Sequence, residues 1–446
     1  MRYHLRTSIY VLMVMLMTTS GFAQELFNPG NIEDLVFARM EENPTEYQPV
    51  TILLADRVDV QALDASFYAK KVSMQQRVQT LITNLKQKAA STQGPVLDAL
   101  ATIPGIDASS VQPMWITNVI YLHANASAIE SIATIAEIEW IEYVAPPELM
   151  EYTVSETMAP ASPNGRELGH DAINAPAMWK LGYTGYAQSA LVIDTGVDID
   201  HPALATRYKG TIVDDNLAWF QQNSADPLPV DCDGHGSHVC GTIVGLNPIN
   251  NDTIGVAPGG TWMAAPDIRG NSGCNPSFNP FVTFQWALDP DGNPATTDDM
   301  PAAINNSWGR GGWSNPNATP PGPTVFCTGT FPNLMTTLEA AGIAAIFAAG
   351  NDGTAGPSTV SAQARSPITL VNPFAVGSVN GNSSALQLSG FSSRGPTTCI
   401  DSSNRSLWIK PEVVAPGQNV RSSTPNGGYS VFSGTSMASG SGRSGG

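Results

Sequence analysis

Short apolar runs alternate with helix-like pieces and with long loops rich in Gly, Pro and Asn throughout the second half of the chain. The runs at 190–193, 344–349 and 374–379 are too short for helices, and turn residues bound each of them. Such alternation is typical of an α/β domain with a mostly parallel central sheet, flanked by helices and buried on both faces. This pattern constrains the fold more than any other feature of the sequence.

The first half of the chain predicts a separate, small α+β domain, which we place at 24–146. A helix is indicated by apolar positions at helical spacing: Val78, Leu81, Ile82, Leu85 and Ala89. Around it lie strand-like runs at 50–54, 111–116, 119–124 and 140–144 and a short helix near 126–135. This domain holds no concentrated cluster of catalytic residue types.

Two further segments lack periodicity. Residues 147–165 are polar and contain Pro, with neither helical nor strand spacing, so we interpret them as a linker. The last residues, 439–446, consist almost entirely of Gly and Ser and predict a flexible tail. The α/β domain then occupies 166–438.

The N-terminal residues 1–23 predict a secretory signal. An apolar run of nine residues, 9–17, follows Arg2 and Arg6 and precedes small residues at Gly21 and Ala23. The run is about half of the roughly 20 residues needed to span a bilayer, so we expect no stable membrane insertion. We therefore expect a secreted protein, extracellular or periplasmic.

Charge and cysteine content add two expectations. With 21 Lys and Arg against 38 Asp and Glu, the net charge of -17 argues against nucleic acid as a partner. Five cysteines lie in the second half, and in an exported protein they can pair and leave one over.

Candidate catalytic residues stand at three separate points of the α/β domain. Asp194 follows the run at 190–193 directly, and the carboxyl end of a strand is where open α/β sheets place their sites. His235 lies among glycines ahead of an apolar helix, and we interpret its neighbour His238 as a core histidine. Ser436 follows Gly434-Thr435 at a predicted helix start, where its own N–H is free to bind an oxyanion.

Asn351 adds a side-chain amide at the end of the run 344–349, and an amide there can donate to the same oxyanion. The chain order Asp, His, Ser is one of the known linear orders of the catalytic triad. An α/β-hydrolase needs its acid and its histidine after the serine, and only Arg443 among titratable residues follows Ser436. Ser444 stands in a superficially similar Gly-Arg-Ser-Gly-Gly ending, and we treat it as a decoy.

The second domain resembles the subtilisin-like serine peptidases, or subtilases. Eight motifs match that family in order between Trp179 and Ala438: Ala-Leu-Val-Ile-Asp194-Thr-Gly with His201-Pro202, Gly234-His235-Gly-Ser-His238, Ile254-Gly-Val-Ala-Pro258, Asn305-Asn-Ser-Trp-Gly309, Ala348-Ala-Gly-Asn351, Phe391-Ser-Ser-Arg-Gly395, Lys410-Pro-Glu-Val-Val-Ala-Pro-Gly417 and Gly434-Thr-Ser436-Met-Ala438.

The resemblance implies a serine endopeptidase that is made as a zymogen and hydrolyses protein or peptide substrates. It implies that Asp194 orients His235, that His235 is the base, and that Ser436 is the nucleophile.

For the oxyanion, the resemblance implies that Asn351 and the Ser436 N–H are the donors. The residues that would bind substrate are an edge strand and a pocket wall: Ser307, Trp308, Gly309, Ala349 and Gly350. The small domain would be the chain's own inhibitory propeptide in cis, cut within the linker. No metal and no cofactor is implied for the chemistry.

Three departures from the family pattern set further expectations. Ala203 stands where many subtilases have an acidic calcium ligand, and the 250–252 loop is short, so structural calcium is weakly supported. Cys240 replaces a small residue and can pack as a small hydrophobe. Glycine costs about 1 kcal/mol inside a helix, so we expect the tail after Ala438 not to form the helix that the family builds there. The peptidase domain would then be incomplete at its C-terminal end, with Ser436 poorly supported.

Other functions stay open at this point. The chain could be an inactive fragment or pseudoenzyme that binds peptides without cleaving them. An aspartic peptidase built on Asp194-Thr195-Gly196 would need a second such carboxylate from a homodimer. A metal hydrolase could use Asp233, His235, His238 and the nearby cysteines, although no zinc-binding spacing fits well.

Overall fold

The computed structural model of the chain describes residues 30–144, 147–155, 162–222, 226–268, 279–309, 326–366, 368–369, 371–399 and 405–441. The expected signal segment 1–23 and the end of the tail, with Ser444, lie outside these residues. Within the described ranges, no helix combines the length and the apolar character needed to cross a membrane.

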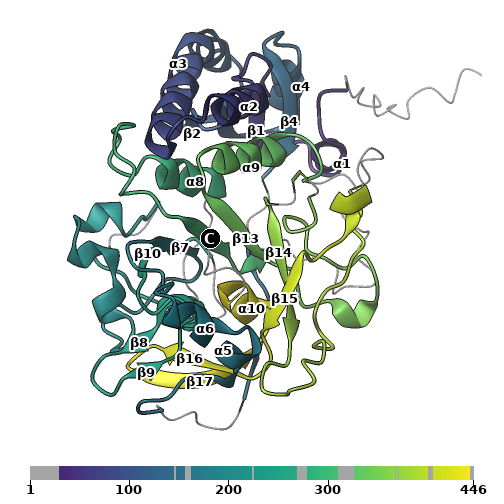
Figure 1. Cartoon of the computed structure of the whole chain (residues 1–446). Helices are drawn as coiled ribbons and strands as arrows, with labels where there is room; N and C mark the ends of the chain where they lie inside the picture. The colour runs from purple at the N-terminus through teal and green to yellow at the C-terminus, as the bar shows by residue number, and fades with distance from the viewer. Residues whose placement is uncertain are drawn as a thin grey trace, which may run out of the picture.

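The small domain is an antiparallel sheet covered by helices, as the sequence predicts (Figure 1). The strand order is β2-β3-β1-β4, with bounds β1 Gln48–Leu54, β2 Ile106–Met114, β3 Val119–Ala124 and β4 Ile138–Tyr143. The helices are α1 Asp34–Glu42, α2 Val60–Lys70, α3 Met74–Leu100 and α4 Ala126–Ala133. Helices α1 and α2 were not predicted from the sequence, and β2 begins five residues before the predicted run at 111–116.

Helix α3 follows the predicted periodicity. Its positions Val78, Leu81, Ile82, Leu85 and Ala89 are all buried, and the Ser73 hydroxyl caps its start by accepting from the Gln76 N–H. The apolar stripe therefore fixes the helix on the core.

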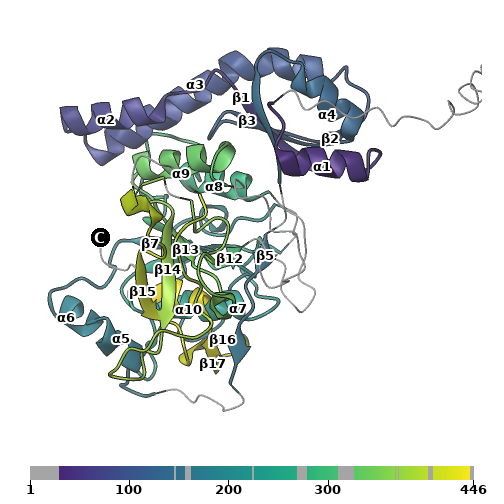
Figure 2. The ribbon, with the colours of Figure 1, turned by 90° about the vertical axis from the view of Figure 1, so that its right-hand side faces the viewer.

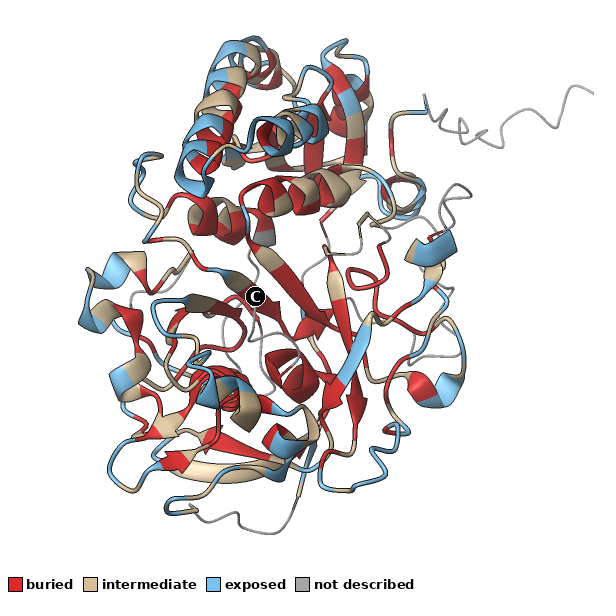
Figure 3. Cartoon of the chain, viewed as in Figure 1, coloured by how far each residue is buried: buried red, intermediate tan, exposed pale blue. Residues whose placement is uncertain are grey.

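The large domain has a parallel six-stranded sheet in the order β10-β7-β11-β13-β14-β15, which confirms the α/β prediction. Its strands are β7 Ser189–Ile193, β10 Thr261–Ala265, β11 Ala303–Asn306, β13 Ala344–Ala348, β14 Phe374–Val379 and β15 Val413–Pro416. Helices α7 His235–Val244 and α10 Thr435–Ser441 are buried at the sheet, and α8 Pro280–Leu288 and α9 Thr330–Ala340 lie toward the small domain (Figures 1 and 3).

The described residues of this domain also form shorter elements. They are α5 Leu168–Ala172, α6 Ala175–Lys180, β8 Leu246–Asn247, β9 Asp252–Thr253, β12 Trp308–Gly309, β16 Val420–Thr424, β17 Gly428–Ser433 and five short 3-10 helices, η1 Ala205–Arg207, η2 Lys209–Thr211, η3 Asp215–Leu217, η4 Gly353–Ala355 and η5 Arg405–Trp408. Strands β16 and β17 form an antiparallel hairpin that leads directly into α10.

The two domains share one hydrophobic cluster. Leu81 and Leu85 of α3 belong to the same buried cluster as Phe284 of α8 and Leu338 of α9. Polar contacts add to it, since the Gln285 side-chain oxygen accepts from Trp115 N–H at 2.7 Å. The small domain is therefore docked by a continuous apolar contact rather than joined only through the chain.

The described part 147–155 of the segment interpreted as a linker contains two strands. β5 Glu148–Leu149 pairs antiparallel with β12, and β6 Thr153–Val154 pairs antiparallel with β17 (Figure 2). Main-chain bonds to a partner strand hold these residues, and such bonds require no alternation of apolar and polar side chains. Strands this short can therefore form in a segment that shows no strand periodicity.

The expectation for the tail is also wrong in its first three residues. α10 continues through Ser439, Gly440 and Ser441, all of them buried. A Cβ at Gly440 would lie 3.3 Å from atoms of Thr242 and Ile243, so a small residue lets α10 pack closely on α7. Tertiary packing therefore outweighs the weak helix propensity of these residues.

The cysteines pair in part as expected. Cys327 and Cys399 form a disulfide, and Cys240 is buried and free. Burial raises the pKa of the Cys240 thiol, which is consistent with its predicted packing role.

Candidate active site

Asp194 and His235 form a direct, fully buried contact. Asp194 directly follows β7, and its Oδ1 lies 2.7 Å from Nδ1 of His235, the first residue of α7. Both side chains have no exposed surface. The Thr195 N–H donates to the same Oδ1 at 2.8 Å, so the carboxylate is fixed on two sides.

Glycines around His235 allow this approach. Gly234 precedes α7 with φ of 103°, a conformation that favours glycine. A Cβ at Gly236 would lie 2.0 Å from the carbonyl oxygen of Gly196, so no larger residue fits there. The Asp231 carboxylate holds the turn by accepting from the N–H groups of Gly234 and Ser237.

The local charges favour protonated His235. Burial lowers its pKa, but the carboxylates of Asp194, Asp233 and Asp231 outweigh burial and raise the pKa above its ordinary value. Its Nε2 has no hydrogen-bond partner among the described residues. A buried imidazole with one nitrogen on a carboxylate and the other unpartnered can accept a proton at Nε2.

Ser436 lies on α10, which packs against α7 and the central sheet. Its hydroxyl donates to the carbonyl oxygen of Ser307 at 3.5 Å, and no hydrogen bond joins it to His235. The structure therefore brings Asp194 and His235 into contact, and it places Ser436 on an adjacent helix with its hydroxyl bonded to the Ser307 carbonyl, between β11 and β12.

Asn351 follows β13 and contacts the residue before Ser436. Its Oδ1 accepts from both the N–H and the hydroxyl of Thr435 at 2.9 Å. Its Nδ2 donates to the carbonyl oxygen of Glu151 at 2.5 Å. The side-chain oxygen of Asn351 thus fixes it to the start of α10. The Asn351 amide N–H is directed at the carbonyl of Glu151, in the segment 147–155.

The predicted substrate-binding residues lie together beside this point. Trp308 and Gly309 form β12, whose partner is β5 of the same chain. Ser307 donates through its hydroxyl to the Ser436 carbonyl at 3.2 Å, and the Gly350 N–H donates to the Thr435 hydroxyl at 3.1 Å. Ala349 is fully buried.

Several residues at the site were missed by sequence reasoning. Met150 and Tyr152 come from the presumed linker, and the Tyr152 ring lies 4.8 Å from the His235 ring. Asp231 accepts from N–H groups at the start of α7, and Thr435 contacts Gly350 and Asn351 after β13. Thr435 stands inside a motif that the sequence analysis quoted, whereas nothing in the linker's composition indicated contact with His235.

The alternative sites find no support in the geometry. His238 Nε2 bonds to the carbonyl of Val420, and burial lowers its pKa to about 3, so it is the core histidine that was predicted. Asp194 contacts an imidazole and an N–H group, not the second carboxyl group of an aspartic peptidase. Among the described residues, no group of three or more His, Cys, Asp and Glu side chains is arranged to hold a metal ion.

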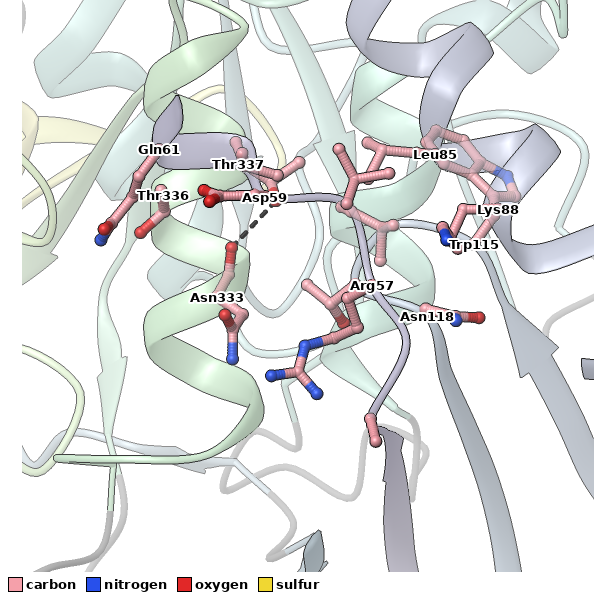
Figure 4. A pocket seen from close by; sticks show the side chains of 15 residues that line it. Arg57, Asp59, Gln61, Leu85, Lys88, Trp115, Asn118, Asn333, Thr336 and Thr337 are labelled. Carbon is pink, nitrogen blue, oxygen red and sulfur yellow. Dashed lines mark hydrogen bonds between the residues drawn. The ribbon is translucent and has the colours of Figure 1, made fainter. Parts of the chain in front are cut away.

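A polar hollow elsewhere lies at the seam between the domains. Arg57 and Asp59 from the small domain face Asn333 and Thr337 of α9 across it (Figure 4). Its lining includes no candidate catalytic residue, so it is separate from the site around His235.

Comparison with known proteins agrees with the fold. The Subtilase family profile matches residues 189–441. The chain is 28% identical to bacillopeptidase F of Bacillus subtilis (strain 168) over 451 residues, which cover 94% of this chain and 29% of that protein. Over 273 residues, or 60% of this chain, it is 32% identical to subtilisin of Bacillus pumilus and to subtilisin E of Bacillus subtilis (strain 168), covering 79% and 57% of them.

These matches define the class: the chain belongs to the subtilase family of serine peptidases. Its sequence also resembles that of bacillopeptidase F, and this chain spans less than a third of the length of that protein.

Proposed function

We propose that this chain is a secreted serine endopeptidase made as a zymogen, with Asp194, His235 and Ser436 as its triad. The buried 2.7 Å contact between Asp194 and His235, beside the helix that carries Ser436, is the observation that carries the proposal. Family membership supports the same assignment.

In the proposed reaction, His235 Nε2 takes the Ser436 hydroxyl proton while Oγ attacks the substrate carbonyl carbon. Asn351 and the Ser436 N–H donate to the developing oxyanion. Collapse of this intermediate breaks the C–N bond, and the leaving nitrogen takes the proton from His235. Water then hydrolyses the acyl-enzyme with His235 again as base.

The substrates that we propose are protein or peptide chains in an extended conformation. β12 offers main-chain hydrogen bonds that can take a peptide strand, and Ala349 with Gly350 would wall the side-chain pocket. No cofactor is needed for this chemistry because side chains supply both the nucleophile and the base. The net charge of -17 argues against nucleic acid as a substrate.

For the small domain we propose the role of an inhibitory propeptide in cis. The shared hydrophobic cluster with α8 and α9 and the pairing of β5 with β12 support this role. The apolar run within 1–23 supports export, after which this leader would be removed.

Peptide hydrolysis by the full chain tests the proposal. We expect the wild type to hydrolyse casein, Ser436→Ala to lose that activity, and Ser444→Ala to keep it. A folded wild-type chain that binds peptides but cleaves none would instead support a pseudoenzyme. Activity that survives Ser436→Ala would rule out the serine mechanism.

A further inference from the structure

A buried cluster of charges joins three segments of the large domain that are far apart in the sequence. Arg421 of β16 is only 7% exposed, and its guanidinium bonds to both carboxylate oxygens of Asp252 in β9, with Nη1 at 3.3 Å from Oδ1. The same guanidinium bonds to the carboxylate of Glu167, the residue before α5. Asp252 has no exposed surface, so Arg421 rather than water compensates its charge.

The guanidinium is also held by its neighbours. It lies over the ring of Tyr429 in β17, 4.6 Å from the ring centroid. The Tyr429 hydroxyl in turn accepts from Asn247 Nδ2 at 3.4 Å. A planar guanidinium that is stacked and paired on two sides fits this place in a way that an ammonium group does not.

On one side, the cluster fixes the residues that lead into the large domain. The Ser162 N–H donates to Asp252 Oδ2 at 3.0 Å. The Asn164 N–H donates to the carbonyl oxygen of Asn250 at 2.8 Å. With the pair between Glu167 and the guanidinium, these bonds anchor the start of the domain to the hairpin of β8 and β9.

On the other side, β16 supports the helix that begins with His235. The Ser422 hydroxyl donates to the carbonyl oxygen of His238 at 2.8 Å. The next hydroxyl along the strand, that of Ser423, donates to the carbonyl oxygen of Ser237 at 2.8 Å. The strand that carries the guanidinium therefore also carries side chains that hold α7.

The residues of this junction do not fit the structural calcium that the family pattern suggests here. The Ala203 carbonyl accepts from an N–H group of the hairpin 246–253 at 3.0 Å, but the Ala203 side chain brings no oxygen. The side-chain oxygens of Asn247 and Asn250 accept from N–H groups within the hairpin, and those of Asp252 are bonded as described above. Ca²⁺ needs roughly six to eight oxygen ligands, and here these side-chain oxygens already have partners.

We propose that the guanidinium of Arg421 is the cation that holds this junction together, and that the junction has no coordination site for Ca²⁺. The positive charge is covalently attached to β16, so a chelator cannot remove it. This inference does not rest on the proposed function, because it concerns the stability of the domain and not its chemistry.

Thermal unfolding of the full chain tests the part that concerns calcium. The chain carries Ser436→Ala, so that proteolysis does not contribute, and its Tm is measured with about 1 mM Ca²⁺ and with EDTA. We expect Ca²⁺ to shift the Tm equally, or not at all, in this chain and in the same chain with Asp252→Asn. A rise in Tm with Ca²⁺ that Asp252→Asn abolishes would overturn the inference, because Ca²⁺ would then bind at this junction.

Two arginine variants in the same background test the role of the guanidinium. Arg421→Ser leaves the buried Asp252 carboxylate without its partner, and we expect the Tm to fall by at least about 5 °C. Arg166→Ser is the matched control, since it breaks an ion pair with Asp171 in which both side chains are half exposed, and it should shift the Tm by less than about 2 °C. Equal Tm values for the two variants would contradict the role of Arg421.

Arg421→Lys provides the comparison if Arg421→Ser does not fold. It keeps the charge but cannot bond to both carboxylates through a planar fork, so we expect a Tm between those of the parent chain and Arg421→Ser. A Tm of Arg421→Lys equal to that of the parent chain would show that the guanidinium itself is not required.

Discussion

At the residue scale, the site depends on side chains that each serve two partners. Asn351 is the clearest example, because its Oδ1 accepts from Thr435 while its Nδ2 donates to the Glu151 carbonyl. Replacement by Asp keeps the acceptor and removes the donor, so it separates the contact with Thr435 from the proposed role as oxyanion donor.

We expect Asn351→Asp to lower kcat about 10²- to 10³-fold, the usual effect of losing one oxyanion donor, with little change in KM. Steady-state kinetics on a peptide substrate measures both constants. Asn216→Asp is the matched control, because Asn216 is exposed and is not a candidate site residue. Equal kcat values for Asn351→Asp and the wild type would remove Asn351 from the oxyanion site.

The charge around His235 predicts the direction of a pH effect. A general base must be neutral, so activity falls as pH drops through the pKa of His235, which the neighbouring carboxylates raise. Removing one carboxylate lowers that pKa.

We therefore expect Asp233→Asn to move the acidic limb of the kcat/KM profile to lower pH. Asp214→Asn, which removes an exposed carboxylate, should leave the limb in place. A shift to higher pH in Asp233→Asn would contradict the electrostatic account of His235.

At the element scale, α10 differs from what residue propensity alone indicates. Its last three residues are Ser, Gly and Ser, yet they are helical and buried because they fit closely against α7. Small side chains are required there by packing, although they are poor helix formers.

A larger residue in α10 should therefore destabilise the domain. We expect Gly440→Leu to lower the free energy of unfolding by about 1–3 kcal/mol, the usual cost of overpacking. Gly390→Leu is the control, since a Cβ there meets no atom within 4 Å. Denaturant titration of both variants makes the comparison, and equal stability would show that α10 is loosely packed.

Some of the elements could be predicted from sequence patterns and others could not. Strand β14 and the core face of α3 could be predicted, because each depends on residues close in sequence. β5 and β6 could not, because main-chain pairing with distant strands leaves no side-chain pattern. The contact between Tyr152 and His235 was missed for the same reason.

At the scale of the whole molecule, the two domains meet at a titratable group. Glu142 of β4 accepts from the Thr330 N–H at the start of α9, at 3.1 Å. Burial there raises its pKa from 4.5 to about 7. The docked state therefore retains a proton that the separated domain loses at lower pH.

Docking should accordingly weaken as pH rises from about 4.5 to about 7, since the charged carboxylate is disfavoured in the seam. We expect Glu142→Gln to remove most of this dependence and to dock more tightly than the wild type at pH 7. Glu137→Gln, an exposed change on the same domain, should retain it. Release of the cleaved small domain, followed by size-exclusion chromatography across this pH range, is the measurement. Faster release of Glu142→Gln at pH 7 would contradict the account.

The central claim is that Ser436 is an activated nucleophile served by His235 and Asp194. Fluorophosphonate labelling of the full chain, followed by peptide mass mapping, tests it most directly, because only an activated serine in a formed oxyanion site reacts quickly. The account predicts one label, on Ser436, that is lost in Ser436→Ala and strongly slowed in Asp194→Asn. A folded chain that takes no label, or takes it on another serine, would contradict it.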